Sequence, residues 1–235
     1  QTNFSYTLSQ MKFDQLELKS EKSFLTGQLQ FDYNRVDFKE FSDKVKISGH
    51  FNDSTIDLEE LNQLYDEFGV NQKAVLSTIF SGTLNDLKLD DFELKTNRNT
   101  VINGEVKFKN LFNSVSDNFE MDGEFQQISS TYTDLIALLP RVLGDRIPSN
   151  FKTLGRFDMK GTTTVTNEVV EAKMDINTDI GTLSLDLKLD HVVDIDTASY
   201  NGHIQFSNFD LGLLLEDPTI GLVTSDLRVS GRGFT

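Results

Sequence analysis

The stretch FELKTNRNTVINGEVKF, residues 92–108, decides the fold class of this chain. Apolar and polar residues alternate on both sides of TNRNT, with Phe92 and Leu94 before it and Ile102 and Val106 after it. Alternation with period two is typical of strands that have one apolar and one solvated face, and a short polar stretch between two of them is typical of a hairpin turn. We therefore predict an antiparallel hairpin here.

A similar strand pair, LELKSEKSFLTGQLQF, begins at Leu16, 76 residues before Phe92. Three segments with helical rather than alternating spacing recur at nearly the same distance, at 57–69, 133–144 and 208–221. Self-similarity at a fixed period is the signature of a repeat protein. The predicted unit is one short helix followed by about four strands, roughly 75 residues in all.

This period divides the chain into four parts. Residues 1–56 are predicted to form a partial repeat made of strands, and 57–132 and 133–207 to form two full units. Residues 208–235 are predicted to start the next unit. The chain is therefore expected to be a segment of a longer repeat array.

The predicted fold is mostly β, a long antiparallel meander sheet with one short helix per repeat. An apolar face of this size is unfavourable in water, so we expect the sheet to curl into an open β-taco, a groove. Leu18 and Leu94 should then face the same concavity. The residues predicted to line the groove are Leu16, Leu18, Leu29, Phe31, Val45, Ile47, Phe51, Phe92, Leu94, Ile102, Val106, Phe108, Phe119, Met121, Phe125, Phe157, Met159, Met174, Ile176, Leu183, Leu185, Leu187, Leu189, Ile204, Phe206, Leu227 and Val229.

Charge and composition exclude several classes of partner. The chain has 235 residues, with 22 Lys and Arg against 37 Asp and Glu, for a formal net charge of −15. Phosphate backbones and anionic headgroups repel such a surface, so neither nucleic acid nor peripheral binding to an anionic membrane is expected. There is no cysteine, and no apolar run is long enough to span a bilayer. Any membrane anchor is expected to lie outside this chain.

No catalytic motif is present, and we predict neither an enzyme nor a cofactor nor a metal site. Two acidic clusters offer oxygen ligands of the kind that Ca²⁺ prefers, but neither has EF-hand spacing. Acidic residues that alternate with apolar ones are instead typical of the solvated face of a strand. The two clusters are Asp190, His191, Asp194 and Asp196, and Asn85, Asp86, Asp90 and Asp91.

Three stretches carry a resemblance to a known family: STYTDLIALLPRVLGDRIPSNFKTLGRFDMKGTTTV at 130–165, INTDIGTLSLDLKL at 176–189 and NFDLGLLLEDPTIGLVTSDLRVSGRGFT at 208–235. They resemble the repeat region of TamB-like translocation and assembly module proteins, especially those of Bacteroidota. These belong with the AsmA-like, repeating β-groove bridge proteins of the Gram-negative envelope.

The resemblance implies a periplasmic body with a hydrophobic groove, held to the inner membrane by a helix outside this chain. It also implies a TamA-like outer-membrane barrel as partner of regions outside this chain. The function expected on this basis is to shield phospholipid acyl chains during lipid transport and outer-membrane assembly. Two alternatives stay open: a scaffold or chaperone that receives outer-membrane strands at exposed sheet edges, and a structural β-solenoid with a dry core.

Overall fold

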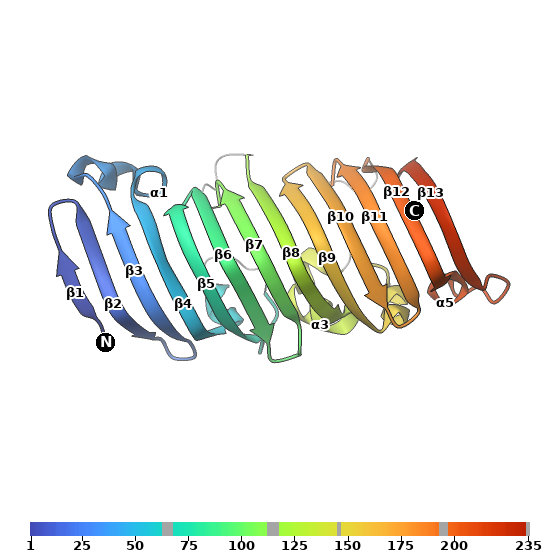
Figure 1. Ribbon diagram of the computed structural model, residues 1–235, viewed down its shortest axis with the longest axis horizontal. Coiled ribbons are helices and arrows are strands. Elements are labelled where there is room, and N and C mark those ends of the chain that lie inside the picture. Colours follow the sequence, from blue (N-terminus) through green and yellow to red (C-terminus); the bar gives the residue numbers. More distant parts are fainter. Residues whose placement is uncertain (63–67, 112–117, 145–146, 193–196, 234–235) are drawn as a thin grey trace.

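The computed structural model describes residues 1–62, 68–111, 118–144, 147–192 and 197–233. It contains one antiparallel sheet of 13 strands, in which every strand pairs with its neighbours in sequence (Figure 1). The predicted long meander is therefore confirmed. The strands are β1 (Asn3–Tyr6), β2 (Gln10–Lys19), β3 (Phe24–Asp32), β4 (Lys46–Asp57), β5 (Lys73–Thr83), β6 (Asp86–Thr96), β7 (Val101–Lys109), β8 (Glu120–Thr131), β9 (Arg156–Thr166), β10 (Val169–Thr178), β11 (Gly181–Asp190), β12 (Ser199–Asp210) and β13 (Leu222–Arg232).

Long connections recur every four strands. The connections β3–β4, β7–β8 and β11–β12 lie at one end of the strands. The connections β4–β5, β8–β9 and β12–β13 lie at the opposite end of the strands. All remaining connections are short hairpin turns. The helices are η1 (Arg35–Glu40), α1 (Phe41–Lys44), α2 (Leu58–Leu61), α3 (Tyr132–Leu138), α4 (Pro140–Leu143), η2 (Ser149–Leu154) and α5 (Leu211–Leu215).

Helices form in all three predicted segments, but they are shorter than the spacing indicated. Asp57 caps α2, because its carboxylate accepts a hydrogen bond from the Glu59 amide at 3.1 Å. The N-cap of α3 is Thr131, whose hydroxyl accepts a hydrogen bond from the Asp134 amide at 3.2 Å. Residues 63–67, in the first predicted helix, lie outside the described residues. The helices η1, α1 and η2 were not predicted.

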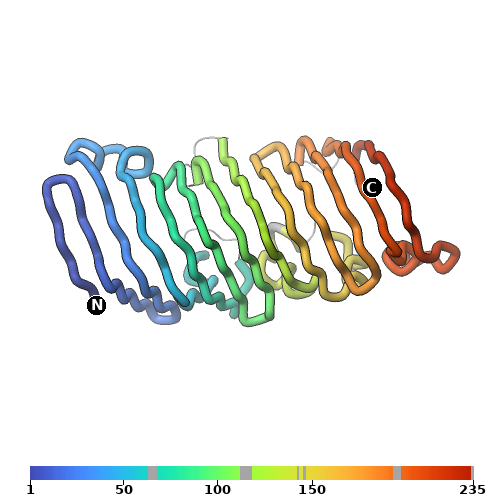
Figure 2. The backbone as a smooth tube through the Cα atoms, viewed as in Figure 1, coloured from blue at the N-terminus to red at the C-terminus, as the bar shows by residue number. Residues whose placement is uncertain are grey.

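The predicted curl is not observed. The sheet is neither closed nor strongly curled (Figure 1). The strands lie side by side along the molecule, and the described N- and C-terminal strands are at opposite ends (Figure 2). Each connection joins neighbouring strands, so no described segment crosses the sheet to draw its two ends together. Part of the apolar face is covered by helical segments, which lie along one set of strand ends (Figure 1).

The strand register places the apolar residues in rows that run across the sheet. Directly paired residues project on the same face, so a chain of pairs defines one row. Leu94 belongs to such a row, and Leu18 pairs with Leu25 on the same face. Phe24, next to Leu25, is linked by direct pairs through Thr55 and Val75 to Lys95, next to Leu94. Leu18 and Leu94 therefore lie on the same face of the sheet, as predicted, but that face is not the strongly curled concavity that was expected. The row that contains Leu94 consists of Leu76, Leu94, Ile102, Ile128, Met159, Ile176, Leu183 and Phe206.

Bulges keep these rows continuous on five strands. β2, β4, β6, β8 and β12 each carry one extra residue relative to a neighbouring strand. An extra residue reverses the alternation on the strand that contains it. In β6, for example, Leu87 and Leu89 precede the bulge and Phe92 and Leu94 follow it, and all four face the same side. Asp91 in this bulge has a φ of 47°.

The helical segments pack on the apolar face along one edge of the sheet. Leu58 of α2, Ala74 of β5 and Leu138 of α3 form a buried cluster, against which Leu94 also packs. Successive segments also contact one another, because the Asn150 side chain donates to the Leu214 carbonyl at 2.7 Å. Together α2, α3, α4, η2 and α5 form what we call the helical rail, visible at the lower edge of the sheet in Figure 1.

Hairpin turns are tied to the rail at equivalent places in two successive repeats. Lys22, in the β2–β3 turn, forms an ion pair with Glu59 of α2 at 3.0 Å. Arg98, in the β6–β7 turn 76 residues later, lies 3.9 Å from Asp134 of α3. Glu60 adds to the first of these contacts by accepting a hydrogen bond from the Ser20 hydroxyl at 2.6 Å. The rail therefore holds the turns as well as covering apolar side chains.

The hydrogen bonds between Glu60 of α2 and the β2–β3 turn predict a pH-dependent contribution to the stability of the fold. Hydrogen bonds from the hydroxyls of Ser20 and Ser23 lower the pKa of Glu60. A lowered folded-state pKa stabilises the fold above the unfolded value and loses that effect as the pH falls through the folded value. Glu60→Gln should therefore reduce the free energy of unfolding at pH 7 and have little effect at pH 3, as measured by urea titration.

Glu21→Gln is the matched control for this experiment, because Glu21 lies in the same turn and no side-chain hydrogen bond to it is described. It should leave stability unchanged at both pH values. An equal effect of Glu60→Gln at pH 7 and pH 3 would contradict the role of the ionised carboxylate.

Candidate functional site

The predicted groove residues lie together on one face of the sheet, which we call the apolar face. Those in strands belong to rows that the register makes continuous from β2 to β13. Val45 and Phe119 lie immediately before β4 and β8, respectively. The structure thus places on one face side chains from nearly the whole length of the chain, from Leu16 of β2 at one end of the sheet to Val229 of β13 at the other.

Most of the apolar face is only half-buried. Val106 and Ile47 are buried, whereas Leu18 and Leu227 remain 56% and 44% exposed. The accessible surface of the chain is 14082 Å², compared with about 10,700 Å² expected for a compact monomer of this size. The excess is the result of a single-layer architecture, in which no second sheet covers the apolar face in the described part of the chain.

Aromatic rings lie over glycines on this face. A Cβ at Gly49 would come within 2.7 Å of Cζ of Phe80, from the neighbouring strand β5. A Cβ at Gly104 would come within 3.0 Å of Cδ1 of Phe125, and one at Gly123 would overlap the same ring. At Gly49 and Gly104 a backbone carbonyl oxygen of the neighbouring strand lies closer still, so only at Gly123 is the ring alone in the way.

The end of the apolar face at β1–β4 is rich in aromatic residues. The rings of Phe4 and Phe13 are tilted by 40° with centroids 4.9 Å apart, and Phe13 meets Phe31 edge to face at 6.2 Å. Phe41 of α1 continues the series, 6.0 Å from Phe31. Aromatic pairs of this kind add to the energy of area burial. The opposite part of the face, on β10 and β11, is aliphatic.

Several residues of the apolar face were missed by the sequence analysis. Some, such as Phe13, Leu89 and Ile128, lie on the half of a bulged strand whose alternation is reversed, so a fixed period assigns only the other half correctly. The others lie at strand positions that the sequence analysis left out although their alternation is regular. A usable signal exists, because each bulge coincides with two consecutive polar residues inside an alternating strand. The missed residues are Phe4, Met11, Phe13, Leu25, Leu76, Phe80, Leu87, Leu89, Ile128, Val165, Val170, Ala172 and Tyr200.

The opposite face is covered by a lattice of ion pairs between neighbouring strands. Lys109 binds Glu120 at 2.6 Å and Lys188 binds Glu171 at 3.1 Å. The hydrogen bond from Lys188 to Glu171, supported by the charge of Asp190, raises the pKa of Lys188. Exposed pairs of this kind contribute little stability individually. They make this face strongly hydrated, and it is unsuited to apolar ligands.

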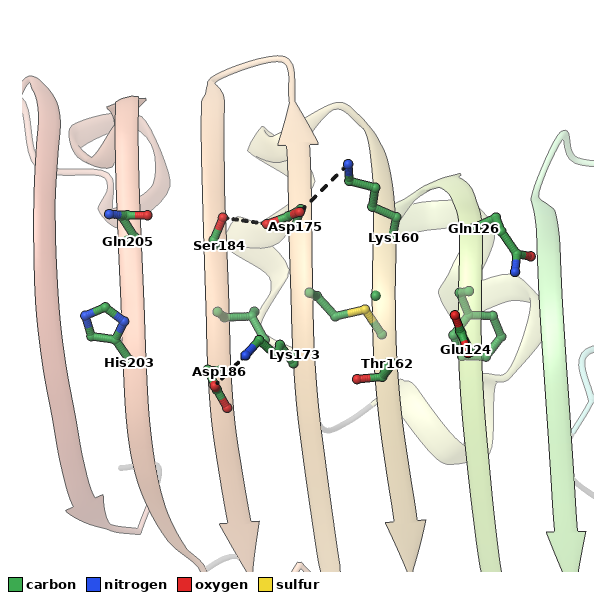
Figure 3. A pocket seen from close by; sticks show the side chains of 14 residues that line it. Glu124, Gln126, Lys160, Thr162, Lys173, Asp175, Ser184, Asp186, His203 and Gln205 are labelled. Atoms are coloured by element: carbon green, nitrogen blue, oxygen red, sulfur yellow. Dashed lines mark hydrogen bonds and ion pairs between the residues drawn. The ribbon is translucent and has the colours of Figure 1, made fainter.

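A shallow depression of about 660 Å³ lies on this polar face, over β8–β12. Figure 3 shows Lys160 directed toward Asp175, and Lys173 directed toward Asp186. Ser184 donates to Asp175 at 2.7 Å. Two ion pairs, Lys160–Asp175 and Lys173–Asp186, thus lie within the depression, which is on the face opposite the predicted groove.

The two acidic clusters are part of the sheet surface. Lys88 binds Asp90 at 2.6 Å, and Asn85 is buried and donates to Asp43. Asp190 lies 3.7 Å from Lys188, while Asp194 and Asp196 are outside the described residues. Within the described ranges, no three His, Cys, Asp or Glu side chains converge where they could hold a metal ion.

Comparison with known proteins gave no relatives. No family model matches the chain, and no curated protein or solved structure matches it. No helix among the described residues is long and apolar enough to cross a bilayer. The candidate site is therefore defined by its own geometry, as an apolar face about four rows deep with the helical rail along one edge.

The ring of Phe125 predicts a double-mutant effect at Gly123. Gly123→Ala should destabilise the protein by about 1–3 kcal/mol, since the new methyl group displaces the ring. In a Phe125→Ala background the same change should cost less, because the three atoms closest to the new methyl group all belong to the Phe125 ring. Urea unfolding of the four proteins of the cycle measures the coupling.

Gly221→Ala is the control, because no atom lies within 4 Å of the position that its methyl group would occupy. It should be close to neutral. Additive costs at Gly123 and Phe125, within about 0.3 kcal/mol, would show that the ring does not rest on the glycine.

Proposed function

We propose that the apolar face binds the acyl chains of phospholipids and shields them from water as they pass between the two membranes of a Gram-negative envelope. On this proposal the chain is a non-enzymatic, periplasmic segment of a bridge protein. It supports outer-membrane assembly, and its inner-membrane anchor and its contact with a TamA-like barrel lie outside this chain. The resemblance of residues 130–165 and 208–235 to TamB-like repeats supports this assignment.

The observation that carries the proposal is a continuous apolar face without a second layer over it in the described part of the chain. Four rows spaced by two residues span about 20 Å along the strands, compared with about 15 Å for one leaflet of a hydrocarbon core about 30 Å thick. Thirteen strands spaced by about 4.8 Å extend the same surface over roughly 60 Å. The face is therefore deep enough for an acyl chain and much longer than one lipid.

Transfer of a lipid to this face depends on burial of its methylene groups. Each buried CH₂ contributes about 0.8 kcal/mol, so a two-chain lipid leaves a bilayer only if most of its length is covered. The helical rail supplies one wall of the site, and half-exposed side chains such as Leu185 and Leu187 supply its floor. We propose that the sheet and the rail together form an open trough, a shallower form of the predicted taco.

The rows explain how a lipid could move along this surface. Apolar side chains recur along each row, so a lipid that moves from strand to strand stays in contact with an apolar surface. Direction then has to come from the membranes or from partners at the ends. Lipid mass spectrometry of protein purified without detergent tests the proposal directly, since co-purified phospholipid is expected.

A scaffold for unfolded outer-membrane strands is the second candidate, favoured by one observation. β1 and β13 each pair with a single strand among the described residues, and a sheet grows by the addition of strands to its outermost members. Peptides bound in this way add to a sheet through main-chain hydrogen bonds. A protein that carries no lipid but protects an unfolded barrel protein from aggregation would support this function over lipid binding.

The lipid proposal predicts the effect of charges on the floor of the trough. Replacing both Leu185 and Leu187 with Asp should abolish binding of a fluorescent fatty acid while leaving most of the circular dichroism signal of the sheet. The apolar floor has fewer protein contacts than a closed core, so these changes should cost less than a polar substitution in a core.

The matched control is Thr182→Asp with Asn201→Asp, which adds the same charge to the polar face of β11 and β12. It should bind the fatty acid as the unmodified protein does. If the Leu185 and Leu187 variant unfolds completely, whereas the control does not, these leucines belong to a dry core and the trough is disproved.

A further inference from the structure

The part of the apolar face on β6–β13 has the composition of a surface between two protein layers. Four rows of directly paired residues cross these eight strands, and none of their residues is Asp, Glu, Lys, Arg or His. A contiguous exposed apolar surface is typical of an interaction site. We propose that two lipid-free copies of this chain pair face to face through this surface. The inference does not rest on the proposed function, because it concerns protein without lipid.

The four rows are numbered here from the helical rail outward. The first is Leu94, Ile102, Ile128, Met159, Ile176, Leu183, Phe206 and Ser225, and the second is Phe92, Gly104, Phe125, Gly161, Met174, Leu185, Ile204 and Leu227. The third is Leu89, Val106, Gly123, Thr163, Ala172, Leu187, Gly202 and Val229, and the fourth is Leu87, Phe108, Met121, Val165, Val170, Leu189, Tyr200 and Gly231.

The surface is large enough for a stable pair. Eight strands spaced by about 4.8 Å extend over roughly 38 Å, and four rows span about 20 Å along the strands. The resulting footprint is roughly 750 Å² per copy, close to the about 800 Å² per partner of a standard protein–protein interface. Further strands on either side would enlarge this footprint without removing any part of it.

The helical rail decides how two such faces fit together. It lies on the apolar face along one set of strand ends. A two-fold axis parallel to the strands would set the two rails against each other and hold the sheets apart. A two-fold axis parallel to the rows reverses the strands, so each rail lies beside the rail-free strand ends of the other copy. A helix is about 10 Å across and packed sheets are about 10 Å apart, so a rail fills the gap between the sheets.

The side chains of the two central rows are complementary in size about this axis. The axis brings the second row of one copy over the third row of the other, strand by strand. On β10 Met174 then lies over Ala172, and on β12 Ile204 lies over Gly202. The strand between them, β11, contributes a leucine to each central row. Large side chains that face small ones are how two layers interdigitate at native density.

The charge of the chain does not oppose this pairing. The charged side chains of the strands lie on the polar face, in pairs such as Lys109–Glu120 and Lys188–Glu171, and this face is directed outward in both copies. The charges of the two polar faces are therefore farther apart than the about 10 Å between packed sheets. That distance exceeds the Debye length of about 8 Å at 0.15 M salt, so the repulsion is screened.

Sedimentation velocity over a concentration series tests the proposal, on protein refolded from urea without lipid or detergent at 0.15 M salt. We expect a monomer–dimer equilibrium whose Kd rises about tenfold in Ala172→Met, because a large side chain then faces Met174 and overpacks the interface. The double variant, Ala172→Met with Met174→Ala, restores a large side chain opposite a small one and should dimerise as the unmodified chain does. Non-specific apolar association would instead be strengthened by Ala172→Met.

Lys173→Met is the matched control. Lys173 lies between Ala172 and Met174 on β10, but its side chain is on the polar face and is 76% exposed (Figure 3). The change should leave the dimer Kd unaltered. Circular dichroism and the urea midpoint of Ala172→Met verify that the variant is folded. A monomer at all concentrations would overturn the proposal, as would a dimer that responds to Lys173→Met and not to Ala172→Met.

Cysteine cross-linking tests the direction of the axis. The chain contains no cysteine, so introduced thiols report only on contacts between copies. Ile176 and Val170 are the first- and fourth-row residues of β10, so an axis parallel to the rows brings one over the other. A mixture of Ile176→Cys and Val170→Cys should cross-link through a thiol reagent that spans about 10 Å, the distance between packed sheets.

Ile176→Cys alone should not cross-link, because its two copies lie six positions apart along the strand, roughly 20 Å. An axis parallel to the strands would instead bring first-row residues over one another. Cross-linking of Ile176→Cys with itself, or none in the mixture, would overturn the proposed pairing.

Discussion

Strand register is the constraint on which the rest of this structure depends. The sheet is a series of twelve antiparallel pairings, and a slip of one residue in any of them would move apolar side chains to the solvated face. Short hairpin turns fix half of these registers. The bulges in β2, β4, β6, β8 and β12 correct the phase of strands whose alternation is reversed, so that the rows continue without a break.

A single layer makes unusual demands on stability. Most domains bury their apolar faces between two layers, whereas here the helical rail covers only one edge, around Leu58, Ala74 and Leu138. On the remaining surface, side chains pack against other residues of the same sheet. Phe80, for example, packs beside Gly49 of the neighbouring strand, and Phe125 beside Gly123 of its own strand. The backbone hydrogen bonds of the ladder and these in-plane contacts therefore carry much of the stability that a second layer supplies elsewhere.

The two faces of the sheet offer different chemistry to partners. The polar face satisfies its own charges through pairs such as Lys109–Glu120 and Lys188–Glu171, and the net charge of −15 keeps it hydrated and repels anionic surfaces. The apolar face offers contact area without any built polar site among the described residues. This division favours a role in holding apolar chains, in which specificity comes from shape and burial rather than from hydrogen bonds to a particular headgroup.

The sequence by itself determined the fold class, the four-strand period of the long connections and the face to which Leu18 and Leu94 belong. Each of these follows from local alternation or from spacing that is visible along the chain. The residues that it predicted to line a groove do lie on one face of the sheet. It missed residues of that face such as Leu89, because the alternation of β6 is reversed at a bulge and one fixed period covers only half of that strand. Only the tertiary structure decided how far the sheet curls and which helical segments lie together along its edge. Both depend on the balance of twist, packing and solvent exposure over thirteen strands, and no local pattern encodes that balance.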